Sequence, residues 1–307
     1  MPAKVTVIGS YNRDLLIQLN QLPVVGETLL GKNYQEGHGG KGSNQAVAAA
    51  RLGAEVHFIG CIGQDRHGDE ALSLWEQENI HIRVRRDPNT ATGMAMIMVL
   101  DSGDNAIVVG PGANQSLSAE DITLMEESIS ESHVLLIQLE IPVETALHAI
   151  KLAKKYRTKV ILNPAPVQPL PEDIFQYIDI LTPNETEARV LVGERADSSI
   201  STEYLCEKLI HLGVKALVMT RGKAGALFTH GKGFKEIPSP KIKAVDPTGS
   251  GDAFNGALAV GLAVGMPFEN AVQQACYAGA HCATKLGVLS GLASKDQLEQ
   301  FISNNPV

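Results

Sequence analysis

The sequence has little positive charge, few cysteines and no long hydrophobic run, and each shortage excludes a class of function. Its 307 residues carry a formal net charge of -8 with no block of four Lys or Arg, so no surface for nucleic acid or an anionic membrane is expected. No apolar run approaches the ~20 residues of a membrane span, and no signal-peptide pattern opens the chain. The four cysteines lack the spacing of a zinc site or a disulfide framework. We therefore expect a cytoplasmic protein without nucleic-acid or membrane partners.

Short apolar segments alternate with helical patterns along most of the chain. Continuous apolar runs predict strands buried on both faces of a parallel sheet, at residues 4–9, 56–60, 133–139, 159–163, 178–182 and 215–220. Amphipathic helices are predicted at 43–53, 118–129, 142–156 and 201–213, with Pro142 in a first turn. This alternation indicates a doubly wound α/β fold with a mostly parallel sheet.

Two stretches, 11–37 and 91–109, depart from this rhythm. They alternate or form hairpin patterns without helices, and "DSGDN" at 101–105 predicts a turn between two strands. We expect them to form one small β-sheet that acts as a lid over a site at the edge of the main sheet. The α/β domain would then comprise residues 1–10, 38–90 and 110–307.

The segment "GHGGKG", residues 37–42, formally matches the G-x-G-x-x-G pattern of dinucleotide sites. No buried strand precedes it, which disfavours a dinucleotide oxidoreductase. A Walker A loop is excluded because Gln35 and Gly42 occupy positions that require Gly and Ser or Thr. We interpret the segment as a glycine turn that approaches a ligand, with Lys41 and Asn44 at its rim. The simpler alternative is a tight turn with an exposed lysine.

Polar side chains also follow two predicted strands. Asn12 and Asp14 stand two residues apart after the first strand, so both point the same way in an extended chain. Ligands of α/β proteins bind at the carboxyl ends of parallel strands, and this pair suits a polyhydroxyl ligand. A surface turn is the alternative for this pair. Glu140 ends another apolar strand and either faces solvent or contacts the ligand.

In "LTPNETEARVLVG", Asn184 and Glu187 share one face at the start of a helix. Such a pair could hold a hydrated magnesium ion through water. The alternative is helix capping alone, with Asn184 as N-cap and Glu187 as its partner.

The run "DPTGSGDAF", residues 246–254, places glycines and small residues directly before a helix. Their backbone N–H groups, together with the positive end of the helix dipole, make an anion hole suited to phosphate. A carboxylate at Asp252 would repel that phosphate unless it acts as a base on the attacking hydroxyl. The alternative, that Asp252 only caps the helix, does not require the glycines.

The motifs "GGKGSNQA", "NPAP" at Asn163, "TPNETE", "TRGKAG" and "VDPTGSGDAF" together resemble the ribokinase-like carbohydrate kinases, the phosphofructokinase B family. The resemblance covers essentially the whole chain. It implies a Rossmann-like α/β domain with a β-sheet lid, a homodimer formed through the lids, and ATP-dependent phosphorylation of a sugar's primary hydroxyl with Mg2+ and K+. The "NxD" and "QLE" motifs lean toward the ribokinase branch and D-ribose. Deoxyribose, a hexose or a nucleoside remain alternative substrates, and a sugar sensor without catalysis is a further alternative.

The resemblance also implies roles for individual residues. Asp252 would be the base that takes the proton from the sugar. The γ-phosphate would lie against Gly249, Ser250 and Gly251. The sugar would be held by Asn12, Asp14, Gly40, Lys41, Asn44, Glu140 and Asp252.

On the nucleotide side, Asn184 and Glu187 would organise magnesium and the phosphates. The nucleotide itself would lie along Thr220, Gly222 and Gly225. The monovalent cation would be bound by the loops that contain Asp246, Thr248, Cys282, Lys285 and Gly287. The family pattern there is "GAQxS", whereas this chain has "GVLSG" with Ser290 displaced by one position, which puts potassium coordination in question.

Overall fold

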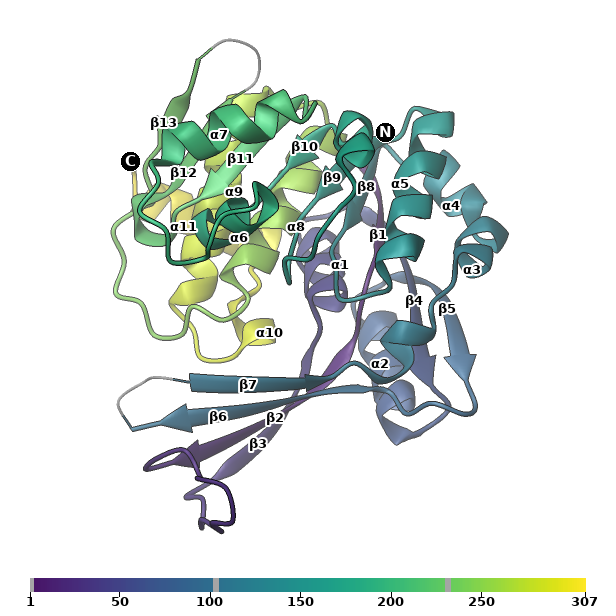
Figure 1. Cartoon of the computed structure of the whole chain (residues 1–307), viewed down its shortest axis with the longest axis vertical. Coiled ribbons are helices and arrows are strands. Elements are labelled where there is room, and N and C mark those ends of the chain that lie inside the picture. The colour runs from purple at the N-terminus through teal and green to yellow at the C-terminus, as the bar shows by residue number, and fades with distance from the viewer. Residues whose placement is uncertain (1–2, 102–104, 230–232) are drawn as a thin grey trace.

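The main sheet of the computed structural model, which describes residues 3–101, 105–229 and 233–307, has nine strands in the order β13-β12-β11-β10-β9-β8-β1-β4-β5 (Figure 1). The strands from β11 to β5 are parallel, and β12 and β13 add an antiparallel edge. Their bounds are β1 Lys4–Ile8, β4 Glu55–Gly63, β5 His81–Asp87, β8 Val134–Ile137, β9 Lys159–Leu162, β10 Ile180–Leu181, β11 Ala216–Thr220, β12 Ala226–Thr229 and β13 Lys235–Ile237. The predicted doubly wound, mostly parallel α/β fold is confirmed.

Helices cover both faces of this sheet over two separate hydrophobic clusters. One face carries α1 Lys41–Arg51, α2 Arg66–Gln77, α8 Ser250–Ala263, α9 Phe268–Ala283, α10 Val288–Gly291 and α11 Lys295–Asn304. The other carries α3 Ala119–Leu124, α4 Glu126–Ser130, α5 Val143–Tyr156, α6 Glu185–Leu191 and α7 Thr202–His211. Short 3-10 turns lie at Gly112–Ser116, Glu172–Tyr177 and Gly222–Ala224. Across the described parts of the chain, no helix has the length and apolarity to cross a membrane.

Three details differ from the sequence prediction. The helix expected at 118–129 divides at Met125, which leaves helical geometry (φ -109°, ψ 16°) and separates α3 from α4. Pro142 precedes α5 as its N-cap because its ψ of 132° is extended. The strand β5 was not predicted because its sequence, HIRVRRD, is an alternating edge strand rather than a continuous apolar run.

A second sheet of four strands projects from the main domain in the order β3-β2-β6-β7 (Figure 1). Its strands are β2 Asn12–Leu19, β3 Tyr34–Gly39, β6 Gly93–Leu100 and β7 Asn105–Gly110. The β2 and β6 strands are parallel and the outer pairs are antiparallel. The division into lid and α/β domain remains a prediction, and its limits at 37 and 109 fall inside β3 and β7. Residues 102–104 of the predicted turn lie outside the described residues.

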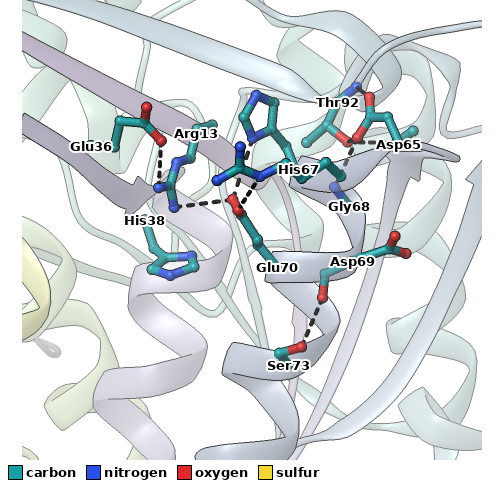
Figure 2. Close-up of polar contacts among 12 residues, drawn as sticks. Arg13, Glu36, His38, Asp65, His67, Gly68, Asp69, Glu70, Ser73 and Thr92 are labelled. Carbon is teal, nitrogen blue, oxygen red and sulfur yellow. Dashed lines mark hydrogen bonds and ion pairs between the residues drawn. The ribbon is translucent and has the colours of Figure 1, made fainter.

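Two residues of α2 and its N-cap, Glu70 and Asp65, bind the base of the small sheet (Figure 2). Arg13 on β2 binds Glu36 on β3 at 2.8 Å and Glu70 on α2 at 3.3 Å. Asp65, the N-cap of α2, accepts hydrogen bonds from the backbone N–H and the hydroxyl of Thr92, both at 2.7 Å. Because Thr92 directly precedes β6, both halves of the small sheet are fixed to the same helix.

Candidate active site

Asp252 lies in the first turn of α8 with only 6% of its surface exposed. Its Oδ2 accepts a hydrogen bond from Asn44 Nδ2 at 2.9 Å, and its Oδ1 accepts one from Gln45 Nε2 at 3.0 Å. The N-cap of α8 is Gly249, in the left-handed region, and no side chain caps this helix. Asp252 is therefore not a capping residue, and both its oxygens are oriented by side chains of α1.

Gln45 was not among the residues singled out from the sequence. Its amide also donates to Asn163 Oδ1 at 3.0 Å and its oxygen accepts from Gln138 Nε2 at 2.5 Å. The available signal was a pair of polar residues, Asn44 and Gln45, at the start of the otherwise Ala- and Val-rich α1. Burial of such a pair requires polar partners, and Asp252 is one of them.

The same network continues to the backbone of the glycine run. Asn163 Nδ2 donates to the Thr182 carbonyl at 3.2 Å, and the Thr182 hydroxyl donates to Asn255 Oδ1 at 2.6 Å. Asn255 Nδ2 then donates to the Gly251 carbonyl at 2.8 Å. A chain of buried hydrogen bonds thus links the Asp252 carboxylate to the backbone of the predicted anion hole.

The two glycines at the start of α8 differ in whether the surrounding structure leaves room for a side chain. Gly249 has a φ of 78°, and a Cβ there would lie 2.5 Å from Val288 Cγ1. A Cβ on Gly251 would meet nothing within 4 Å. The Ser250 hydroxyl is buried and has no hydrogen-bond partner among the described residues. The helix therefore opens onto free space beside an unpaired hydroxyl, which suits an anionic group.

The first residues of helix α1 pack closely against the backbone that connects β1 to β2. A Cβ on Gly40, whose φ is 86°, would lie 2.6 Å from Tyr11 Cα, and one on Gly42 would lie 2.5 Å from the Ser10 nitrogen. Ser43 N–H donates to the Ser10 carbonyl at 2.8 Å. The sequence predicted that these glycines approach a ligand, whereas the structure shows that the protein's own backbone already requires Gly40 and Gly42.

Charged side chains also lie close together at the start of α1. Glu140 accepts hydrogen bonds from the Lys41 N–H at 2.9 Å and from the Ser10 hydroxyl. Burial opposes the charge on the Lys41 side chain, but nearby carboxylates outweigh burial and raise its pKa. Those carboxylates belong to Asp252, Glu140 and Glu187. Carboxylates from three distant parts of the chain therefore lie near the Lys41 ammonium group.

Asp14 belongs to the same group of acids. Burial, followed by the charges of Glu140 and Asp252, raises the pKa of Asp14 to about 7. Its carboxylate lies against Gly39, where a Cβ would come within 2.2 Å of Asp14 Oδ1. Close carboxylates with a perturbed pKa are typical of functional sites.

Two amide side chains line the same region. Asn12 is 3% exposed, and its Oδ1 accepts from Asn114 Nδ2 at 2.9 Å, so Asn114 orients the Asn12 amide. Asn114, which follows β7 in the chain, was missed because nothing in the local sequence marks its distant partner. Asn44 Oδ1 is buried without a partner among the described residues. An unpaired buried oxygen is costly, and a ligand hydroxyl would satisfy it.

Asn184 and Glu187 form a capping box at the start of α6, with both reciprocal hydrogen bonds at 2.8 Å. The pKa of Glu187 is raised, chiefly by burial, and the charge of Asp252 raises it further. The pair therefore caps the helix, and Glu187 also faces the charges around Asp252.

A cavity of about 600 Å³ opens beside α8, large enough for a nucleotide. Thr220, Gly222 and Gly225, the predicted nucleotide residues, line it together with Ser250 and Gly251. Gly225 is also required by packing, since a Cβ there would lie 2.0 Å from the Ile237 carbonyl oxygen. A Cβ on Gly222 would meet nothing within 4 Å. The cavity thus runs from the end of β11 to the glycines before Asp252.

Sequence reasoning missed the far wall of this cavity. It consists of one stripe of α9, namely Cys276, Gly279, Ala280 and Ala283, and of the loop at 239–247, which includes Lys241. The helical spacing of small residues in α9 was the available signal. Small side chains leave room for a flat ring system, and Lys241 and Lys223 add positive charge.

The residues predicted to bind a monovalent cation come from the loop before α8 and from the end of α9 with the loop that follows it, and the structure places these segments together. Asp246 accepts hydrogen bonds from the Thr248 and Gly287 N–H groups, both at 3.0 Å, and Cys282 Sγ lies 3.5 Å from the Thr248 carbonyl oxygen. Burial would raise the pKa of Asp246, but these hydrogen bonds outweigh it and lower the pKa. The displaced Ser290 donates to the Gly287 carbonyl at 2.8 Å.

Comparison with known proteins agrees with this geometry. The model of the pfkB family carbohydrate kinases matches residues 2–295. The chain is 38% identical over 305 residues to a ribokinase of Haemophilus influenzae, with 99% of this chain and 100% of that protein covered. A ribokinase of Thermotoga maritima superimposes with a TM-score of 0.90 at 37% identity, over 98% of this chain and 100% of that one.

A ribokinase of Arabidopsis thaliana, solved with ribose and ATP, superimposes with a TM-score of 0.89 at 30% identity. The overlap covers 98% of this chain and 99% of that one. With a family match over nearly the whole length and a fold shared end to end, the chain belongs to the pfkB family of carbohydrate kinases.

Proposed function

We propose that the protein transfers the γ-phosphate of MgATP to the primary hydroxyl of D-ribose. The observation that carries this proposal is the position of Asp252. Its buried carboxylate lies between a polar pocket, formed by Asp14, Asn44 and Glu140, and the cavity that reaches the start of α8. Ribokinases of similar sequence and fold, one of them solved with ribose and ATP, support the choice of sugar.

In this proposal Asp252 accepts the proton of the sugar hydroxyl as its oxygen attacks the γ-phosphorus. The bond between the γ-phosphorus and the bridging oxygen breaks, and ADP leaves with that electron pair. Amide donors from Asn44 and Gln45 hold the carboxylate in place. The backbone N–H groups of Gly249 and Gly251 face the developing negative charge, since phosphoryl transfer is mostly positioning and charge stabilisation. The Ser250 N–H donates to the Pro247 carbonyl at 3.1 Å and would join them only after releasing that bond.

The sugar pocket suits a pentose with a full set of hydroxyls. Asp14, Glu140 and the unpaired Asn44 Oδ1 accept hydrogen bonds, whereas the Lys41 ammonium and the Asn12 amide donate them. A site built to pair every hydroxyl discriminates against an analogue that lacks one, because a buried polar group is then left unpaired. This favours ribose over deoxyribose, which remains the main alternative substrate.

Two ions complete the proposal. Mg2+ would be held through water by Asn184 and Glu187 and would neutralise phosphate charge. The closeness of Glu187 to the charges of Lys41 and Asp252 supports this placement. K+ would lie beside Asp246, whose lowered pKa keeps the carboxylate ionised next to the start of α8. Main-chain oxygens would come from the loop before α8, which contains Thr248, and from the end of α9 and the loop after it, which contain Cys282, Lys285 and Gly287.

We also propose a homodimer formed through the small sheet. Strand alternation places Leu16, Ile97, Ile107 and Val109 on the face that carries Asp14. Ile107 is 51% exposed and Val109 is 43% exposed, and a contiguous exposed apolar face marks an interaction surface. Light scattering after gel filtration should give a dimer for the wild type and a monomer for Ile107→Lys. A monomeric wild type would contradict this part of the proposal.

An ADP-release assay over a panel of sugars tests the substrate assignment. Ribose, deoxyribose, a hexose and a nucleoside are compared at equal concentration with MgATP, with potassium present and absent. Ribose should give the highest kcat/KM. Turnover of deoxyribose or a nucleoside without turnover of ribose would overturn the substrate while leaving the kinase family intact. No ADP release with any acceptor would favour a sugar-binding sensor.

A further inference from the structure

A second cluster of chemically capable side chains lies where β4 and β5 begin, at the end of the sheet opposite the Asp252 site. Glu55 and His57 stand two positions apart on β4, so both side chains leave the same face of the sheet. His81 opens β5 and pairs in register with His57. The two imidazole centroids are 4.8 Å apart, and His57 Nε2 lies 3.8 Å from Glu55 Oε1.

We propose that Glu55, His57 and His81 form a binding site for Zn2+. One potential ligand atom from each residue lies within 4.8 Å of the others, and no other such group occurs in the part of the chain that the structure describes. Two imidazole nitrogens and one carboxylate oxygen are a donor set that zinc prefers over magnesium or calcium. The sheet fixes the three Cβ positions before the ion arrives, so little backbone order has to be gained on binding.

The distances require only a small closure of the side chains. Zinc bonds of about 2.0–2.2 Å place neighbouring ligand atoms roughly 3.3–3.6 Å apart in a tetrahedron. The pair formed by Glu55 and His57 is already near this separation at 3.8 Å. His81 is exposed and can rotate toward them. A water molecule would take the fourth position.

Charged residues of both signs surround the three proposed ligands. Arg83 and Lys4 place positive charge near the site, whereas Glu131 adds negative charge beside Lys4. Lys4 opposes the ion, because its Nζ lies 3.3 Å from Glu55 Oε1. The same ammonium also pairs with Glu131 at 3.6 Å. When zinc takes the Glu55 carboxylate, Lys4 can therefore keep a partner by moving toward Glu131.

Isothermal titration of the full-length protein with Zn2+ tests the site. Matched variants are His81→Gln, which removes a ligand on an exposed strand end, and His211→Gln, which changes a surface histidine on α7. We expect His211→Gln to bind like the wild type, and His81→Gln to bind at least about tenfold more weakly, a loss at the scale seen for damaged metal sites. Lys4→Gln should bind more tightly than the wild type. Both His variants should keep wild-type kinase turnover in Mg2+.

Two further readouts locate the ion. Zn2+ should raise the melting temperature of the wild type, because the three ligands come together only in the folded state. Any rise in melting temperature caused by Mg2+ at the same concentration should be equal in the wild type and in His81→Gln. Co2+ should give a visible absorption band that His81→Gln loses. Absence of binding to the wild type would overturn the proposal. Equal binding by the wild type and His81→Gln would also overturn it, since the ion would then lie elsewhere, for instance among the carboxylates near Asp252.

Discussion

Replacement of Asp252 by Asn separates its role as a base from its role in packing. General-base catalysis is worth about 10²–10⁴ in rate, or roughly 3–5 kcal/mol, so kcat should fall by that factor. Folding should also suffer. Both carboxylate oxygens accept an amide N–H, from Asn44 and from Gln45. Asn offers one oxygen and one NH2 group, so one buried donor loses its partner at a cost of about 1–3 kcal/mol.

A matched variant distinguishes these two effects. Thr182→Val removes the hydroxyl that donates to Asn255 at 2.6 Å in the same buried network, but it leaves the Asp252 carboxylate and both its hydrogen bonds in place. We expect both variants to lose a similar amount of stability in urea unfolding, whereas only Asp252→Asn loses the larger factor in kcat. Near-wild-type turnover in Asp252→Asn, measured by ADP release with saturating substrates, would refute the assignment of Asp252 as the base.

Three further outcomes follow from the same geometry. Asp14→Ala should raise KM for the sugar far more than KM for ATP, since a group that binds ground and transition states alike acts through KM; equal effects on both substrates would place Asp14 outside the sugar pocket. The pKa of Asp14, raised from 3.8 to about 7 by burial, means that its contribution to stability is fully present below pH 4 and is lost as the pH rises through 7. At 1.36 kcal/mol per unit the effect is at most about 4 kcal/mol. Urea unfolding should therefore show Asp14→Asn gaining stability over the wild type at pH 8 but not at pH 4, and an equal difference at both would contradict this. Potassium should activate, weakly because Ser290 is displaced, and identical rates in K+ and in a bulky organic cation would exclude the cation site at Asp246.

The central strands and the motifs were predictable from the sequence because their signals are local. A strand buried on both faces is a continuous apolar run, so β1, β4, β8, β9, β10 and β11 were all expected. The edge strands β5 and β13 escaped because one side of an edge is open and its sequence alternates or is short. β12, which lies between β11 and β13, escaped because it has only four residues. The sequence could predict an anion hole because the glycines, the helix start and Asp252 are consecutive.

The parts of the site that escaped prediction depend on distant contacts. Gln45 is 207 positions from Asp252, and Asn114 is 102 positions from Asn12, so no local pattern connects either pair. Gly40 and Gly42 were predicted to approach a ligand, whereas the structure places the backbone of Ser10 and Tyr11 against them. A glycine in the sequence indicates that another group comes close to the backbone, but it does not identify that group.

The most direct test of the proposed function is identification of the product by phosphorus and carbon NMR. Purified protein is incubated with MgATP and D-ribose that is isotopically labelled at its primary carbon. The proposal predicts one phosphate ester, coupled to the labelled primary carbon, in amounts equal to the ADP formed, and none with Asp252→Asn over the same time. A phosphate ester on any other carbon, or ADP formed without a sugar phosphate, would contradict the proposal that Asp252 activates the primary hydroxyl.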